Sequence, residues 1–306
     1  MLPRTLKPMT AKVRQPFNSP QFTYEIKWDG YRCLAFLESD GTRLQSRKEN
    51  SFNFLFPEFL SLHQKVKSLG CVLDGELVAI RNGKPSFLQL QKRGLLRNEQ
   101  RIKTAVINIP VIYVVFDLLY LNGHPIYHEI IETRRMALRD ILIPDDQVII
   151  SDYIEEQGIK YFESIVKLGL EGVVAKKKGS KYSIGKCDNW FKFKNRRADN
   201  FIICGYKGQN TIEELILGLY FNEQLIPVGS VSFGLKDRKL IKKELDLIQT
   251  QICPFAYKSG HKKGVVWLKP IIVCTVNYLE WTEANYIREP VFQHFNFDVS
   301  PQDCKV

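Results

Sequence analysis

The strongest constraint on the fold is a series of short runs rich in β-branched and aromatic residues, which extends from Phe22 to Phe193. Such runs favour strands. We expect strands at 22–28, 32–38, 41–47, 71–80, 111–121, 171–177 and 190–194. Four other segments have apolar residues at helical spacing, which predicts helices at 57–70, 86–96, 131–142 and 158–169. The pattern predicts an α+β body in which helices flank antiparallel sheets.

A second pattern follows, with strands expected at 201–207, 215–221, 225–234 and 271–282 around one helix at 238–252. Short strands around a single helix suit a small five-stranded β-barrel of the OB type. A chain of 306 residues is also long enough for two cores. We therefore expect a first domain at 1–197 and an OB-fold domain at 198–306.

The composition indicates a basic protein with an anionic partner. The formal net charge is +11, which favours nucleic acid. The seven cysteines are scattered without a Cys-x-x-Cys pair, so we expect reduced thiols. No run approaches the roughly 18 apolar residues of a membrane span, and the basic N-terminus lacks the apolar run of a secretory signal. We expect a cytoplasmic protein, and the family resemblance described below implies the bacterial cytoplasm or nucleoid.

Residues 24–32 read YEIKWDGYR and place Lys27 among several charged residues. An ordinary lysine has a pKa of about 10.4, and a lysine that acts as a nucleophile needs a lower one. Nearby cations or burial can supply that change. Lys192 and Lys194 lie two residues apart in WFKFK, so on a strand they share one face, opposite Phe191 and Phe193. A polyphosphate would relieve the repulsion between the two amines.

Carboxylates and one aromatic residue complete the pattern. Asp74 and Glu76 share a strand face, and Glu171 opens an otherwise apolar strand. Each could bind a hard cation such as Mg²⁺ or a ribose hydroxyl, or could be an ordinary carboxylate at a strand end. Phe116 is either a core residue or a stacking platform for a purine. Neither a P-loop, a G-x-G-x-x-G motif nor a G-x-S-x-G elbow occurs.

Taken in order, these elements resemble the ATP-dependent DNA ligases of the covalent nucleotidyltransferase superfamily, and most of all the ligase module of bacterial end-joining enzymes. The resemblance rests on KWDGYR, SRKEN, LDGELV, VVFDLLYLNG, EGVVAKK and WFKFK. It extends to WLKPIIVCTVNYLEWT and IREPVF in the second domain. It implies a nucleotidyltransferase domain followed by an OB-fold domain.

The resemblance implies that Lys27 attacks the α-phosphate of ATP and becomes a lysyl-AMP, with Asp29 orienting or activating it. AMP would then pass to a 5′-phosphate at a DNA break, and a 3′-hydroxyl would displace it. Roles also follow for other residues: Glu25 and the backbone of Ile26 at the adenine edge, Phe116 on its face, Arg32 and Arg47 at phosphates, Glu76 at the ribose or a metal, Glu171 at a metal, Lys192 and Lys194 at the α-phosphate, and Lys269 and Arg288 at pyrophosphate.

The expected cofactor beside ATP is Mg²⁺, with Mn²⁺ as an alternative. The expected partners are nicked or broken double-stranded DNA and a Ku-like end-binding protein, with no membrane, and we expect a monomer. Two other functions stay open: an RNA ligase or capping nucleotidyltransferase with the same lysine chemistry, and an inactive scaffold that binds nicks.

Overall fold

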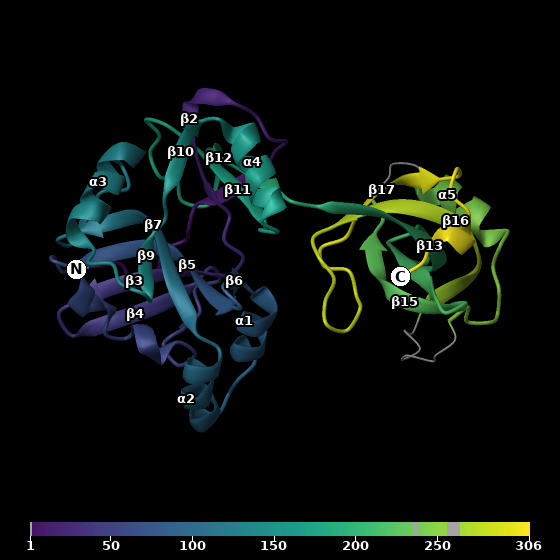
Figure 1. Ribbon diagram of the computed structural model, residues 1–306, viewed down its shortest axis with the longest axis horizontal. Coiled ribbons are helices and arrows are strands. Elements are labelled where there is room, and N and C mark those ends of the chain that lie inside the picture. Colours follow the sequence, from purple (N-terminus) through teal and green to yellow (C-terminus); the bar gives the residue numbers. More distant parts are fainter. Residues whose placement is uncertain (1, 235–237, 256–263) are drawn as a thin grey trace. The chain divides into compact units, whose positions relative to one another are not determined.

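The computed structural model describes residues 2–234, 238–255 and 264–306. The chain divides into two compact units, Met1–Asn195 and Arg196–Val306. The N-terminal unit contains two sheets (Figure 1). In the first sheet the strand order is β1-β12-β11-β2-β10, formed by β1 (Thr10–Val13), β2 (Ser19–Ile26), β10 (Tyr153–Glu156), β11 (Gly172–Lys177) and β12 (Lys186–Lys194).

The second sheet has the order β4-β3-β5-β7-β8, with β6 paired to β5 and β9 to β7. Its strands are β3 (Tyr31–Glu38), β4 (Gly41–Ser46), β5 (Cys71–Arg81), β6 (Lys84–Pro85), β7 (Val111–Leu121), β8 (His124–Pro125) and β9 (Val148–Ile150). The pairings are antiparallel except β1 with β12 and β7 with β9. The predicted class, antiparallel sheets flanked by helices, is confirmed.

Four helices accompany these sheets: α1 (Phe87–Gly94), α2 (Glu99–Asn108), α3 (Ile131–Ile141) and α4 (Gly158–Lys167). Helix α3 packs on β7, α1 on β5, and α4 on β2 and β11. The cores are apolar clusters between these layers, such as the one that joins Tyr24, Ile165 and Phe193. Helix α2 was not predicted, although the side chain of Asn98 caps its first turn by accepting a hydrogen bond from the Arg101 amide at 3.1 Å.

The predicted helix at 57–70 is wrong. The segment forms only two short 3₁₀ helices, Pro57–Phe59 and Leu62–Lys65. The chain then pairs with the segment after α3: the Lys67 amide donates to the Ile141 carbonyl and the Ile143 amide to the Lys65 carbonyl, both at 2.8 Å. These tertiary hydrogen bonds replace the helical ones that the apolar spacing suggested.

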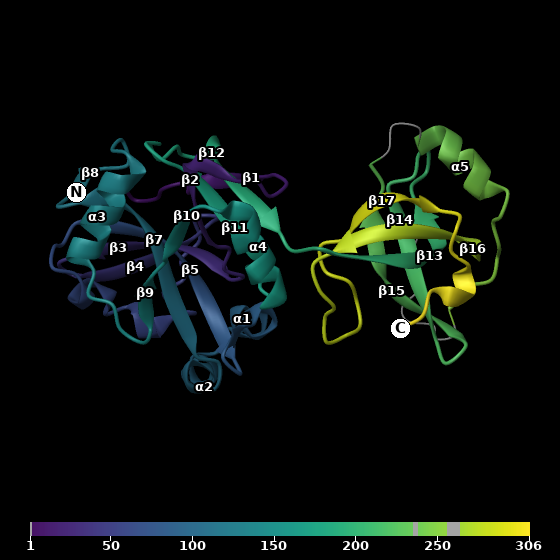
Figure 2. The same ribbon diagram turned by 45° about the horizontal axis from the view of Figure 1, so that its top comes forward.

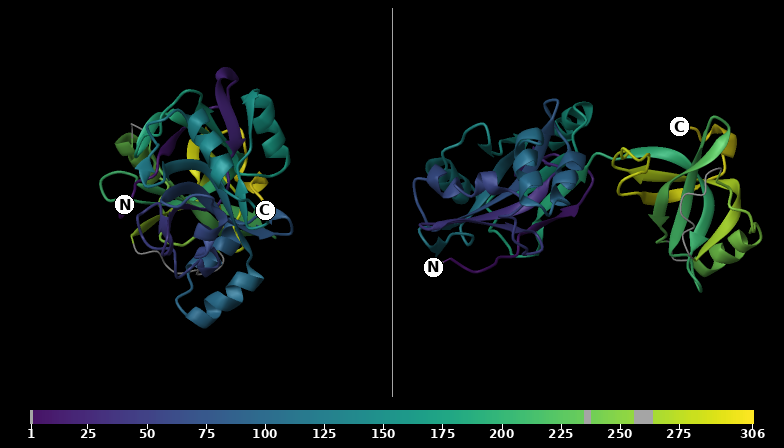
Figure 3. Two further views of the ribbon diagram at one scale, coloured as in Figure 1. Left: turned by 90° about the vertical axis from the view of Figure 1, so that its left-hand side faces the viewer. Right: turned by 90° about the horizontal axis from the view of Figure 1, so that it is seen from below.

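The C-terminal unit is one five-stranded sheet of order β15-β14-β13-β16-β17. Its strands are β13 (Arg197–Lys207), β14 (Glu214–Phe221), β15 (Gln224–Ser232), β16 (Val265–Tyr278) and β17 (Val291–Asn296). The sheet curves (Figure 3) until its edge strands β15 and β17 contact each other. Helix α5 (Arg238–Asp246) follows β15 (Figure 2) and inserts Leu245 into the core. This is the expected OB-fold barrel.

Two predictions for this unit needed correction. The helix expected at 238–252 ends at Asp246, because the next residues pair with β16: the Lys269 amide donates to the Ile248 carbonyl at 2.9 Å. Strand β17 was not predicted. All seven cysteines are free thiols, as expected. Within the described ranges, no helix has both the length and the apolar character that a membrane span requires.

Candidate active site

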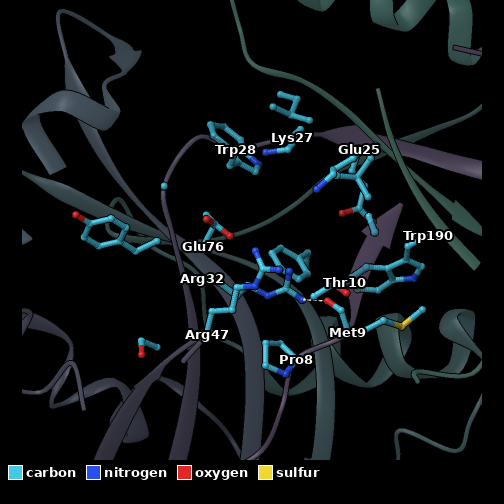
Figure 4. A pocket seen from close by; sticks show the side chains of 18 of the residues that line it. Pro8, Met9, Thr10, Glu25, Lys27, Trp28, Arg32, Arg47, Glu76 and Trp190 are labelled. Carbon is cyan, nitrogen blue, oxygen red and sulfur yellow. Dashed lines mark hydrogen bonds between the residues drawn. The ribbon is translucent and has the colours of Figure 1, made fainter. Parts of the chain in front are cut away.

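A cavity of about 500 Å³ lies between the two sheets of the N-terminal unit. Figure 4 shows Glu25 and Lys27 on one wall and Arg32, Arg47 and Glu76 on the other. The first wall belongs to β2 and the residue that follows it, and the second to β3, β5 and the residue after β4. Of the predicted site residues, the lining includes Glu25, Ile26, Lys27, Arg32, Arg47, Glu76, Phe116 and Lys192. The structure thus gathers residues from five separate sequence segments.

Lys27 is held at the cavity by an ion pair. It follows the last residue of β2, and its amide donates to the Gly172 carbonyl at 2.9 Å. Its Nζ donates to Glu171 Oε2, and Lys194 Nζ lies 3.9 Å from Glu171 Oε1. Burial raises the pKa of Glu171 above its ordinary value, although Lys27 opposes that change. The nucleophile candidate therefore shares one buried carboxylate with a second lysine.

Two glycines permit this approach. Gly30, in KWDG, lies so close to β5 that an added Cβ would be 2.2 Å from the Leu77 carbonyl oxygen. Gly172 has φ +147°, and a Cβ there would lie 1.9 Å from the Phe193 carbonyl oxygen. Side chains at either position would push apart the strands that bring Lys27 next to Glu171 and Glu76. The close approach of neighbouring strands therefore explains why glycine occupies these two motif positions.

The predicted lysine face of β12 is confirmed. Lys192 lines the cavity, while Phe191 and Phe193 pack in the apolar cluster below the sheet. Burial lowers the pKa of Lys192, and the nearby charges of Lys194, Lys27 and Arg47 lower it further. The excess of lysine and arginine side chains at this wall is favourable for a polyphosphate.

Arg32 is fixed by a carboxylate below the cavity floor. Its Nε lies 2.5 Å from Asp74 Oδ1 and its Nη2 2.6 Å from Oδ2, and Asp74 is fully buried. Tyr182 donates its hydroxyl to Asp74 Oδ2 at 2.7 Å. Burial alone would lower the pKa of Arg32, but the charge of Asp74 raises it above the ordinary value. The guanidinium lies 4.5 Å from the ring centroid of Phe116.

Glu76 is the least compensated carboxylate of the cavity. Exclusion of water by the surrounding protein raises the pKa of its carboxyl to about 8. Arg32 and Lys27 act to lower this pKa, whereas Glu171 and Asp74 raise it. A cation bound between Glu76 and Glu171 would offset both the desolvation and the repulsion.

Two protein-family models match this chain. One, the ATP dependent DNA ligase domain, covers residues 1–194, and the other, the ATP dependent DNA ligase C terminal region, covers residues 208–299. The chain belongs to the ATP-dependent DNA ligase family. The resemblance found in its motifs is therefore confirmed.

Individual ligases agree with this assignment. The multifunctional non-homologous end joining protein LigD of Pseudomonas aeruginosa is 30% identical over 97% of this chain and 36% of its own length. DNA ligase C of Mycobacterium tuberculosis is 29% identical over 98% of this chain and 92% of its own. A structure of mycobacterial DNA ligase D complexed with ATP and MES has a TM-score of 0.56 and 28% identity over 98% of both chains. The chain spans 37% of the length of the mycobacterial LigD proteins it matches.

The remaining predicted residues of this ligase chain lie outside the cavity lining. Asp29 is close enough to Glu171 for its charge to add to the effect of burial on the pKa of that carboxyl. Lys269 is exposed on β16, and Arg288 Nη1 lies 2.7 Å from Glu280 Oε1, both within the C-terminal unit. Their roles toward a nucleotide stay predictions.

The carboxylates at the cavity fit a divalent ion that takes only one or two of its ligands from the protein. Among the described residues, no group of three or more His, Cys, Asp or Glu side chains is placed to hold a metal. Mg²⁺, however, is commonly bound by one or two carboxylates and completes its shell with water and substrate phosphates. Glu76 and Glu171, whose charges interact, are such a pair.

Sequence reasoning missed several residues that shape the cavity of this ligase. Pro8, Met9 and Thr10 line it, and Trp190 closes one side. Lys176 could have been found, because it shares a face of β11 with Val174, and both line the cavity. The N-terminal residues and Tyr182 lie outside all the quoted motifs, so no local pattern marked them.

Proposed function

We propose that this chain is an ATP-dependent DNA ligase that seals breaks bearing a 5′-phosphate and a 3′-hydroxyl. The observation that carries the proposal is the position of Lys27, at the wall of a nucleotide-sized cavity and in contact with Glu171. Both family matches, one in each unit, support the same reaction. The match to DNA ligase C, over 92% of the length of that protein, supports it as well.

In the first step Lys27 Nζ attacks the α-phosphorus of ATP and pyrophosphate leaves, so that a phosphoramidate forms. The ammonium must first lose a proton. Glu171 is in direct contact with it and is placed to accept that proton. Lys192 and Lys194 bind the α-phosphate and stabilise the charge that develops on it.

In the second step AMP passes from Lys27 to the 5′-phosphate of the break, forming a DNA-adenylate. Arg47, exposed at the cavity rim, and Arg32 bind that phosphate. In the third step the 3′-hydroxyl attacks the 5′-phosphate and AMP leaves. Glu76 and Glu171 would hold Mg²⁺, which when bound neutralises charge on the reacting phosphates.

The two units take separate roles in this proposal. Residues 1–197 form the adenylation domain and residues 198–306 the OB-fold domain. Lys269 and Arg288 of the second domain orient pyrophosphate during the first step. The net charge of +11 supports binding of duplex DNA. Relatives named for non-homologous end joining support a role in joining breaks, with a Ku-like protein as partner.

The test uses α-labelled ATP and a nicked DNA duplex. The unaltered protein should form an acid-labile protein-AMP adduct and seal the nick, and Lys27→Ala should lose both by at least about 10³-fold. Lys160→Ala, an exposed lysine on α4, is the matched control and should keep both activities. Adduct formation by Lys27→Ala, or none by the unaltered protein, would reject the proposal. Faster sealing of an RNA nick would favour an RNA ligase instead.

A further inference from the structure

Helix α3 carries two buried arginines, Arg134 and Arg135, which lie outside all the quoted motifs. Arg134 pairs with Asp117, with Nε 2.7 Å from Oδ1 and Nη2 2.8 Å from Oδ2. Arg135 donates to Glu25 Oε1 and, at 3.0 Å, to Thr23 Oγ1. Arg134 thus holds Asp117, the sequence neighbour of Phe116, and Arg135 holds Glu25. Phe116 and Glu25 are the residues proposed to meet the base.

The carboxylate of Glu25 is held at both oxygens. Arg135 contacts Oε1, and Lys176 Nζ lies 2.8 Å from Oε2. The Lys176 amine also donates to the Phe116 carbonyl at 3.3 Å. Since each carboxylate oxygen can accept more than one hydrogen bond, both can still accept another from a ligand. The carboxylate plane is fixed without being saturated.

Arg135 is better suited than Lys176 to set that plane. Its guanidinium is planar and lies 4.1 Å from the ring centroid of Tyr153, which is the cross-strand neighbour of Glu25. Thr23 lies two residues before Glu25 and therefore on the same face of β2. Three contacts on one face leave the guanidinium little freedom.

Charge neutralisation alone does not explain Arg135. Glu25 is 3% exposed and Lys176 1%, so these two side chains already form a buried neutral pair. A second buried cation adds a desolvation cost that stability does not require. Such a cost is expected where a carboxylate must stay ionised and aimed at a ligand.

We propose that Arg135 is a positioning residue that fixes Glu25 as a hydrogen-bond acceptor for the 6-amino group of adenine, and so sets the preference for ATP. An ionised carboxylate only accepts hydrogen bonds, and the exocyclic amino group is the donor that adenine offers. The inference rests on the proposed ligase function and specifies how its nucleotide is chosen.

The experiment compares ATP with purine riboside triphosphate, which lacks the 6-amino group. Adduct formation and nucleotide binding by calorimetry are both measured for the unaltered protein and for Arg135→Met. The ATP preference of the unaltered protein should fall about tenfold or more in Arg135→Met, because a charge-assisted hydrogen bond is lost or misaligned. Use of purine riboside triphosphate should be nearly unchanged.

Three further variants separate positioning from folding. Arg139→Met lies one turn along α3, at a largely exposed side chain near Tyr153, and should keep the full preference. Arg135→Lys keeps a cation and should restore part of the preference even if Arg135→Met does not fold. In Glu25→Gln, the additional change Arg135→Met should have little further effect on the preference.

Equal losses with both nucleotides, or an unchanged preference in Arg135→Met and Arg135→Lys, would overturn the inference. The ligase proposal fails by a different result, since the unaltered protein would then form no lysyl-nucleotide adduct with either nucleotide.

Discussion

Glu25 and Glu76 are two carboxylates of one cavity with opposite electrostatic environments. Glu25 contacts two cations, Arg135 and Lys176. Burial raises the pKa of Glu76 to about 8, although the nearby charges of Arg32 and Lys27 oppose that change. The first carboxylate is held by direct contacts with two cations. The second is only partly compensated until a ligand brings further positive charge. We therefore assign Glu25 to recognition of the base and Glu76 to the chemistry at the phosphates.

Replacing each carboxylate by its amide should give the largest effects. If the two amide variants behaved alike, the distinction between Glu25 and Glu76 would be wrong. Glu76→Gln should lower single-turnover sealing by about 10²- to 10³-fold and shift the Mg²⁺ titration, because a ligand for the cation is weakened. Glu25→Gln should mainly reduce the preference for ATP over purine riboside triphosphate.

Glu155→Gln is the control for both, since this exposed carboxylate lies away from the cavity lining and forms an ion pair with Lys178. It should leave sealing and selectivity intact. If Glu76→Gln instead altered the base preference and left the Mg²⁺ titration unchanged, the division between the two carboxylates would be wrong.

A smaller effect is expected on stability when one cation of the Glu25 site is removed. Lys176→Met should lower the free energy of unfolding by about 1 to 3 kcal/mol, because Glu25 Oε2 and the Phe116 carbonyl lose a buried hydrogen-bond donor, although Arg135 still neutralises Glu25. Lys178→Met, two residues along at a partly exposed ion pair, should change it by less than about 0.5 kcal/mol. Urea titration measures both. Equal values would show that Lys176 does not compensate Glu25.

Local patterns in the sequence were sufficient for the parts of the cavity that lie within motifs. Period-two alternation placed Lys192 and Lys194 opposite Phe191 and Phe193, and the strand at Val111–Leu121 has the predicted bounds. These features depend on neighbours in the same strand. The family motifs then pointed to Lys27, Glu76 and Glu171, which lie on predicted strands or directly beside their ends.

Long-range partners could not be predicted in the same way. Arg135 appeared only as one polar residue of a predicted helix, yet it reaches Glu25, 110 residues earlier. Tyr182 reaches Asp74 across 108 residues. Apolar residues recur at helical spacing in the segment 57–70, which suggested a helix. Backbone hydrogen bonds with residues near Ile141 prevent a continuous helix there. Such contacts depend on how distant elements meet.

The last prediction is a pH dependence of stability that arises from Glu76. Its pKa is about 8 in the folded protein against an ordinary 4.5. Between these values the folded state holds a proton that the unfolded state has lost. Stability from this group is therefore fully present below about pH 4.5 and decreases as the pH rises toward 8.

Glu76→Gln removes this dependence, so the stability of the variant relative to the unaltered protein should rise as the pH is increased from 5 to 8.5. Urea titrations of both proteins at several pH values measure the difference, which cancels the titration of other groups. Glu25→Gln is the matched comparison: Glu25 is already paired with two cations, so its amide should not gain stability in this range. A flat difference for Glu76→Gln would mean that water or a cation already compensates Glu76, and the contrast with Glu25 would then disappear.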